Sequence, residues 1–273
     1  METTKYSKVL LGLLAICAMF TSCSDDENDN NGGNGTPSNV TIDLKSVFTG
    51  GMPKSVGDVK SITYNEDGLV STMTTRDGGN ITFEYANVST RAENRAPVVR
   101  MTITYGEGEF SQFTMLLGNN GFVKDAQQVE KDLDGTQEYQ WSFKYNADGQ
   151  ISYMKKSEGD KEVFISYKNG DIVNVKQETE DNDNWEQNVL YTSPTVSSPI
   201  ENKGCIMPFD DAFGIDMDDM AYAYYAGLLG KATKHLPVGV SDEQGDSYYQ
   251  WTFDGNGYPT SVKIDGYTYS FSW

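Results

Sequence analysis

A short pattern that recurs five times constrains the fold of this chain more than any other feature. An apolar residue stands two positions before an aromatic residue or Leu. A turn ending in Gly follows, and apolar residues or Pro stand two and five positions after that Gly. The copies occupy residues 62–73, 115–126, 143–154, 165–175 and 251–262. Asn or Asp beside Gly supplies the positive φ of a tight turn, so the five copies predict a repetitive hairpin architecture.

Other turns fill the gaps between these hairpins, for example at residues 76–80 and 106–109. The chain therefore divides into about fourteen short strands, most of them joined to the next by a tight turn. We predict an all-β fold, an antiparallel up-and-down meander that forms a curved or barrel-like soluble sheet. It should be a single β-rich domain over residues 39–273.

The last strand tests whether such a sheet could lie in a membrane. Tyr267, Tyr269, Phe271 and Trp273 alternate with polar residues, and a closing aromatic resembles the last strand of an outer-membrane barrel. A membrane strand needs about 9–11 residues with an apolar outer face. The runs between turns are mostly about six to eight residues long, shorter than that span, and charges such as Lys144 interrupt them. The soluble sheet is the favoured interpretation.

One segment departs from the strand pattern and predicts a helix near residues 216–230. Asp216 is a plausible N-cap and Gly230 a plausible C-terminal stop. The apolar face of this helix would carry Met217, Met220, Ala221, Tyr224 and Leu228.

The N-terminus predicts export and lipidation. Two lysines precede a twelve-residue apolar run at Val9–Phe20, too short for a spanning helix and typical of a signal peptide. Phe20 to Cys23 resembles a bacterial lipobox, with Phe20 where Leu is usual. We predict a signal peptide over 1–22, acylation at Cys23 and a flexible acidic tether over 23–38. Outer-membrane lipid would then be a partner through Cys23, and the expected location is the outer membrane, at the cell surface.

Three features together resemble a known family. They are the lipobox, the "YNEDG" and "YNADG" hairpins, and the segment "YYAGLLGKATKHLP" at 224–237. The hairpins are similar to the YD-type repeats of large bacterial shell proteins. The whole of residues 40–273 more closely resembles a family of Bacteroidota surface lipoproteins described as having a porin-like fold. This resemblance implies a barrel-like architecture and assigns an activity to no residue.

Charge and cysteine content exclude some classes. The formal net charge of −19 makes nucleic acid a poor partner. With Cys17 in the signal peptide and Cys23 acylated, only Cys205 remains, so no intrachain disulfide is expected.

The search for catalytic chemistry assigns no catalytic residue, no metal site and no cofactor. His235 is the one histidine, and a Ser-His-Asp or Cys-His mechanism would have to use it; the simpler interpretation is a polar residue after a helix. A calcium site could be built from Asp210, Asp211, Asp216, Asp218 and Asp219. The alternative is that these carboxylates cap the helix or lie in solvent, and no EF-hand loop is present. Activity as an enzyme is therefore not expected.

Exposed aromatic residues are the remaining lead to a ligand. Trp185 follows an acidic loop, while Tyr222 and Tyr225 lie off the apolar face of the predicted helix. They could stack on sugar rings, or simply pack under neighbouring loops. We expect a non-catalytic envelope lipoprotein, a ligand- or glycan-binding or accessory module. The alternatives are a structural partner of an outer-membrane complex and, third, a carboxylate-based glycoside hydrolase.

Overall fold

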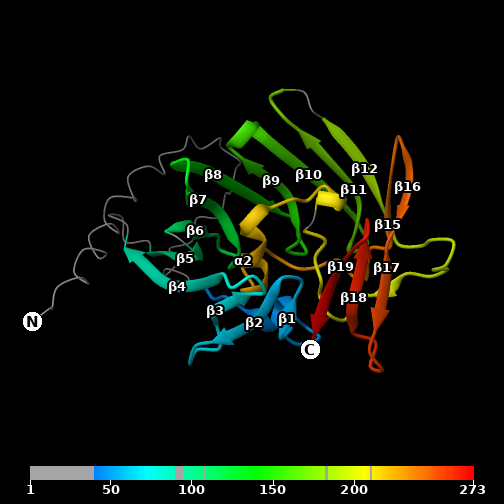
Figure 1. Ribbon diagram of the computed structural model, residues 1–273, viewed down its shortest axis with the longest axis horizontal. Coiled ribbons are helices and arrows are strands. Elements are labelled where there is room, and N and C mark those ends of the chain that lie inside the picture. Colours follow the sequence, from blue (N-terminus) through cyan, green and yellow to red (C-terminus); the bar gives the residue numbers. More distant parts are fainter. Residues whose placement is uncertain (1–39, 90–94, 107, 182–183, 210) are drawn as a thin grey trace, which may run out of the picture.

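The computed structural model describes residues 40–89, 95–106, 108–181, 184–209 and 211–273 (Figure 1). The predicted signal peptide, the tether and Cys23 lie outside the described residues, as does Asp210. The described strands are β1 Ser55–Val56, β2 Val59–Tyr64, β3 Val70–Thr75, β4 Asn80–Ser89, β5 Arg95–Gly106, β6 Glu109–Leu117, β7 Val123–Lys131, β8 Thr136–Tyr145, β9 Ile151–Lys156, β10 Lys161–Lys168, β11 Asp171–Glu178, β12 Trp185–Leu190, β13 Ile200–Glu201, β14 His235–Leu236, β15 Gly239–Asp242, β16 Gly245–Tyr248, β17 Gln250–Phe253, β18 Pro259–Ile264 and β19 Tyr267–Ser272.

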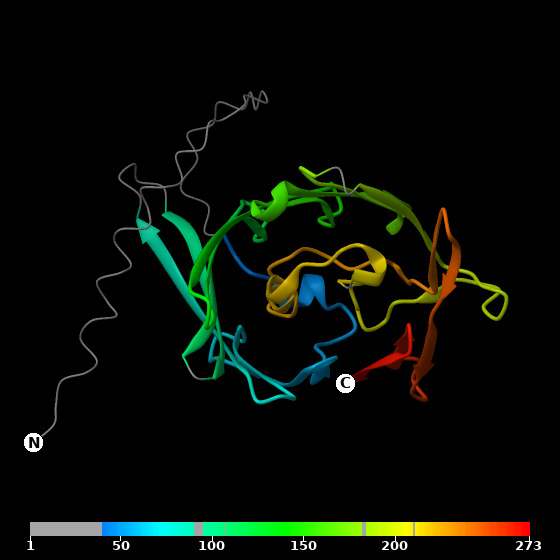
Figure 2. The ribbon, with the colours of Figure 1, turned by 45° about the horizontal axis from the view of Figure 1, so that its top comes forward.

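Seventeen of these strands form one antiparallel sheet that curls into a nearly closed ring (Figure 2). Pairing follows chain order from β2 to β12, passes to β15 and β16, and resumes through β17, β18 and β19. The short strand β1 joins the two ends, because Val56 lies opposite both Phe271 of β19 and Val59 of β2. The predicted all-β, barrel-like meander is confirmed.

All five predicted hairpins are present; four share one turn geometry, and the fifth, at residues 165–175, has a shorter turn in which Asn169 and Gly170 both have positive φ. Each carries a register shift just before its turn, and in each the Gly that ends the turn has a positive φ between 77° and 88°. A bulge bends a strand and increases its twist, so the repeated bulge helps the sheet to curl. The apolar positions after the Gly point inward: Val70, Met73, Val123, Ala126, Ile151, Met154, Ile172 and Val175 are all buried.

The interior of the ring is filled by the chain itself. Residues 202–234, which we call the plug, run through the ring together with the short helix α1 (Leu44–Val47), as Figure 2 shows. Most of the apolar residues of the plug are buried inside the ring, for example Ile215 at 0% exposure and Leu229 at 1%. The core of the protein is therefore the contact between plug and ring, which differs from the packing of two sheets.

Main-chain hydrogen bonds fasten the plug to the row of hairpin turns. The N–H of Val123 donates to the carbonyl of Leu228 at 2.8 Å, the N–H of Lys231 to Gly149 at 2.9 Å, and the N–H of Lys234 to Gly170 at 3.0 Å. The plug residues of these bonds are spaced by three, so one extended segment crosses beneath three successive hairpins.

The predicted helix is much shorter than expected. A 3₁₀ turn, η5 (Asp218–Ala221), leads into the helix α2 (Tyr222–Tyr225). The helix ends at Tyr225. Gly227 follows with a φ of +75°, and the N–H groups of Gly227 and Leu228 bond to the carbonyls of Tyr224 and Ala223, the Schellman arrangement. The predicted stop at Gly230 is wrong because the extended plug segment already begins at Gly227. Two shorter 3₁₀ turns are η3 (Glu158–Asp160) and η4 (Asp211–Phe213).

The outward face of the ring is polar. Hydroxyl pairs link neighbouring strands, such as Ser61 with Thr74 at 2.6 Å and Thr252 with Ser261 at 2.7 Å. Five strands, β4 to β8, have nine residues or more, so the expectation that most runs are shorter than a membrane strand does not hold there. Antiparallel pairing is continuous along these strands.

Among the described residues, no helix has both the length and the apolar character needed to cross a membrane.

Candidate functional site

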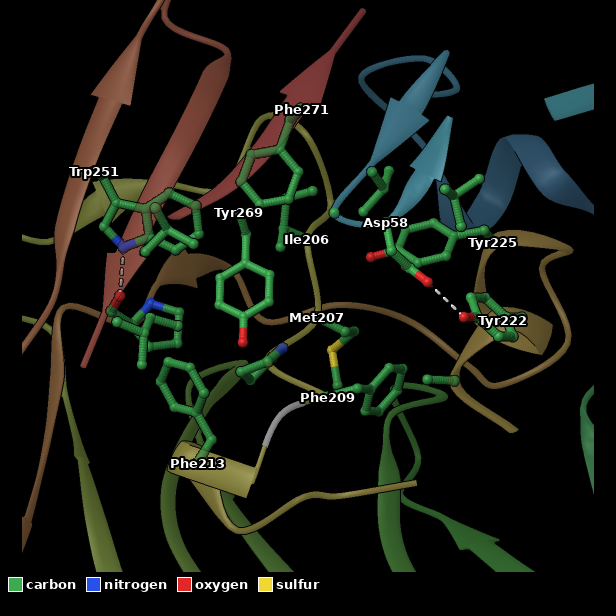
Figure 3. Close-up of a pocket in the computed structure, with 18 residues that line it drawn as sticks. Asp58, Ile206, Met207, Phe209, Phe213, Tyr222, Tyr225, Trp251, Tyr269 and Phe271 are labelled. Carbon is green, nitrogen blue, oxygen red and sulfur yellow. Dashed lines mark hydrogen bonds between the residues drawn. The ribbon is translucent and has the colours of Figure 1, made fainter. Parts of the chain in front are cut away.

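An apolar pocket of about 210 Å³ lies between the plug and the strands that close the ring (Figure 3). The plug contributes Met207, Phe209, Phe213, Tyr222 and Tyr225, and the sheet contributes Asp58, Trp251, Tyr269 and Phe271. The three aromatic residues on the sheet side belong to β17 and β19, so the pocket is a place where plug and barrel leave space between them.

The wall on the sheet side follows from strand alternation. Trp251 and Phe271 are inward residues of β17 and β19, and their rings are nearly parallel, with centroids 6.0 Å apart and an interplanar angle of 20°. The indole N–H of Trp251 donates to the carbonyl of Pro237 at 2.7 Å. This bond satisfies the one polar atom of the indole, so the ring presents an apolar surface to the pocket.

Among the described residues, one carboxylate, that of Asp58, lines the edge of the pocket. The hydroxyl of Tyr222 donates to Oδ2 of Asp58 at 2.6 Å, and Asp58 itself is exposed to solvent (Figure 3). Burial raises the pKa of Tyr222, and the hydrogen bond and the negative charge of Asp58 raise it further. Tyr222 therefore stays a neutral donor at physiological pH.

Tyr225 forms part of the wall next to Tyr222. Its ring stacks on Phe48 with centroids 6.3 Å apart and meets the ring of Tyr224 edge-on at 5.2 Å. Burial raises the pKa of Tyr225. The structure thus brings two of the three predicted ligand-binding aromatics, Tyr222 and Tyr225, into one pocket.

Trp185, the third predicted residue, lies elsewhere. Its indole packs directly on Gly214, where a Cβ atom would come within 1.5 Å of the ring. Trp185 also lines a separate, more polar groove of about 570 Å³, together with Lys176, Glu186 and Glu243. One face of this side chain is therefore used for packing against the plug.

The acids of the predicted helix are paired within the protein. Buried Lys156 bonds to Asp218 at 2.7 Å and forms an ion pair with Glu158. Burial acts to lower the pKa of Lys156, but these two carboxylates outweigh it and the pKa is raised. The hydroxyl of Tyr105 donates to Asp219, whose pKa is raised by burial against that bond.

The alternative of a calcium site finds no geometric support in the described part of the chain, where no group of three His, Cys, Asp or Glu side chains is placed to hold a metal ion. Asp216 instead accepts the N–H of Asp218 at 2.9 Å in a local turn before η5; the N-cap position of η5 is Met217, so the predicted N-cap at Asp216 is wrong.

His235, the first residue of β14 directly after the plug, bonds to the barrel strand β11. Its Nδ1 lies 2.7 Å from Oδ2 of Asp171, and its backbone N–H donates to Oδ1 of the same residue at 2.8 Å. Cys205 has Sγ 3.6 Å from the hydroxyl of Thr49. Neither contact joins the histidine to a nucleophile, so the two side chains are explained by packing.

Sequence reasoning missed Asp58, Trp251 and Phe271 as members of the pocket. The alternation of β17 and β19 identified Trp251 and Phe271 as inward residues. Their distance in sequence from Tyr222 gave no sign that they share a cavity with it, and Asp58 lies in a turn without any recognisable motif.

Comparison with known proteins agrees with this architecture. Residues 62–261 match the model of a family described as a domain of unknown function (DUF4595) with porin-like fold. A porin-like protein from Bacteroides uniformis is similar in structure, with a TM-score of 0.50 and 17% identity over 78% of this chain and 89% of that one. A porin-like protein from Bacteroides vulgatus has a TM-score of 0.50 and 14% identity over 82% and 99%. No curated protein matches the sequence.

Proposed function

This chain belongs to the family of domains of unknown function with a porin-like fold, and we propose that it is a non-catalytic, lipid-anchored protein of the outer membrane that binds a small apolar ligand. The observation that carries the proposal is the aromatic pocket between plug and ring. A ligand pocket is typically concave and apolar with few polar groups, and this one has Tyr222 and Asp58 as its polar pair.

The size and lining of the pocket favour an apolar ligand over a glycan. A cavity of about 150 Å³ holds a benzene ring, so about 210 Å³ is room for a single ring with a short chain. A sugar needs many hydrogen-bond partners, because each unpaired hydroxyl costs free energy on burial. The more polar groove beside Trp185 suits a glycan better.

The lipid anchor rests on the sequence around Cys23. The polar outer face of the ring supports an anchored rather than a membrane-spanning protein, because hydroxyl and charged side chains are costly in hydrocarbon. Acyl chains give about 0.8 kcal/mol per buried CH₂, which is enough to hold a protein on a membrane when two or more chains are present.

Labelling with a fatty-acid analogue tests the anchor. We expect incorporation into the parent protein and none into a Cys23→Ala variant, which should also leave the membrane fraction. Equal labelling of the two proteins would refute lipidation at Cys23.

Filling the pocket tests the ligand. Ala221 lines the pocket, so Ala221→Leu should abolish binding of single-ring probes such as 2-phenylethanol and 2-phenylethylamine, measured by titration calorimetry. Ala86→Leu, at an exposed position of β4, is the matched control and should bind as the parent does. If the parent binds neither probe, or Ala221→Leu binds as well as the parent, the pocket is not the ligand site.

A second candidate function is a structural partner of an outer-membrane complex. The filled interior favours it, because a plugged ring offers most of its surface on the outside. Tyr267 is 72% exposed there and Leu133 is 82% exposed. Co-purification with a membrane complex that survives Ala221→Leu would favour this role.

A further inference from the structure

The charged residues around the pocket indicate which class of ligand it favours. Among the described residues that line it, Asp58 is the one carboxylate, and there is no Lys, Arg or His. Asp219 and Asp77 add to the negative field at Tyr222. A neutral or anionic ligand would gain nothing from this arrangement, whereas a cation would be attracted to it.

Asp58 has capacity left to bind a ligand. Its Oδ2 accepts the Tyr222 hydroxyl at 2.6 Å, and a carboxylate has about four acceptor sites. Arg76 is a basic residue near Asp58, and its Nε–H donates to the carbonyl of the neighbouring Gly57 at 2.9 Å. Among the described residues Asp58 takes part in no ion pair within 4.0 Å, so the guanidinium of Arg76 does not neutralise it.

The aromatic walls suit the same kind of ligand. Tyr222, Tyr225, Tyr269 and Trp251 all line the pocket, and the faces of such rings attract ammonium groups within about 6 Å of their centroids. An apolar group could lie in the interior against Trp251 and Phe271, while a positive group at its end reached Asp58. The pocket is polarised, apolar inside and negative at its edge.

We propose that the ligand of this pocket is a small organic amine, a protonated ammonium group carried on a single aromatic ring or a short alkyl chain. The ammonium donates to the carboxylate of Asp58, and the apolar group packs against Trp251 and Phe271. This inference rests on the proposed function, because it specifies the ligand of the same pocket.

Three single-ring probes of different charge separate the ligand class from the existence of the site. The purified protein is titrated at neutral pH and low salt with 2-phenylethylamine (a cation), 2-phenylethanol (neutral) and 3-phenylpropionate (an anion). We expect the amine to bind about threefold to tenfold more tightly than the alcohol, the gain of one charge-assisted hydrogen bond at a partly exposed carboxylate, and the anion to bind most weakly.

Variants then assign the preference to one carboxylate. Asp58→Asn should bring the amine-to-alcohol affinity ratio close to one, while Asp134→Asn, the same change of charge at a residue that does not line the pocket, should keep the parent ratio. The ratio is the readout because partial misfolding lowers both affinities alike.

Each outcome is decisive. Preference for the amine that is lost in Asp58→Asn supports the inference. Equal binding of the three probes, tighter binding of the alcohol or the anion, or a preference that survives Asp58→Asn overturns the amine as ligand and leaves the pocket as a binding site. Failure of all three probes overturns the site itself.

Discussion

Asn146 shows how a single side chain determines a hairpin in this protein. Its Oδ1 accepts the N–H groups of Asp148 at 3.0 Å and Gln150 at 2.9 Å. Asp254 makes the same two contacts in its own turn, with Asn256 and Tyr258. A short polar side chain that bonds to the backbone ahead of it stabilises a turn, so the repeat is recognisable from sequence because its geometry is local.

The glycine that ends such a turn gives the residue-scale prediction. Gly149 has a φ of +82°, and a Cβ there would lie 3.2 Å from the ring of Phe122. Gly149→Ala should lower the free energy of unfolding by about 1–2 kcal/mol, because an L-residue is strained in the left-handed region.

Thermal or urea unfolding measures the effect, with Gly255→Ala as the control. Gly255 has open space around its Cβ position and no positive φ, so Ala there should be neutral or slightly stabilising. Equal stability of the two variants would contradict the assigned turn geometry.

At the scale of elements, the sequence predicts what is local and misses what depends on the ring. The five hairpins and the inward residues that follow each Gly agree with turn chemistry and alternation. Alternation also predicts that Tyr64 and Phe253 are buried, which is wrong, because the register shifts just before them and leaves them 42% and 37% exposed. The burial of Met217, Met220, Tyr224 and Leu228 also agrees with the predicted apolar face. The length of the helix differs from the prediction, because backbone hydrogen bonds to the hairpin turns replace helical hydrogen bonds after Gly227.

The candidate site divides in the same way. Tyr222 and Tyr225 were recognisable because they are aromatic residues off the apolar stripe. The pocket itself lies where the plug passes β17 and β19. No sequence pattern predicts how closely the plug approaches these strands. Trp185 was also predicted to bind a ligand because it is aromatic. In the structure its indole packs closely on Gly214 of the plug.

The closing strand gives the element-scale prediction. Phe271 is 9% exposed and pairs with Val56, and the indole N–H of Trp273 donates to the carbonyl of Pro259 at 2.7 Å. Deleting residues 271–273 removes this pairing and two packed rings. The free energy of unfolding should fall by at least about 3 kcal/mol.

Denaturant unfolding of the truncated and parent proteins measures that loss. Tyr267→Ala is the matched control, because Tyr267 belongs to the same strand and is 72% exposed; it should change stability by less than about 0.5 kcal/mol. A truncated protein as stable as the parent would mean that β19 does not close the ring.

At the scale of the whole molecule, the outward face decides how the protein meets its surroundings. Strand length does not decide whether the ring could lie in a membrane, since β4 to β8 are long enough for a membrane strand by the usual measure of about 9–11 residues. The composition of the outer face is the deciding feature, because Lys144, Glu84 and Lys168 are exposed on it.

The whole-molecule prediction concerns residues 39–273 prepared without Cys23. We expect this protein to be monodisperse on a sizing column in buffer without detergent, with a β-rich circular dichroism spectrum and cooperative unfolding. A protein that stays dispersed only with detergent or lipid would show that the ring needs a bilayer.

The position of the plug in the chain has a consequence for folding. Ser55 and Ser272, whose hydroxyls lie 2.8 Å apart, are separated by 217 residues, and contacts between such distant residues form slowly. The plug precedes β15 to β19 in sequence, so the hairpins from β2 to β12 can assemble around it before the last strands arrive. Enclosure then needs no threading of a chain end through a finished ring. The slowest step should be the docking of β19 onto β1, a final seam that leaves the pocket's outer wall incomplete until it forms.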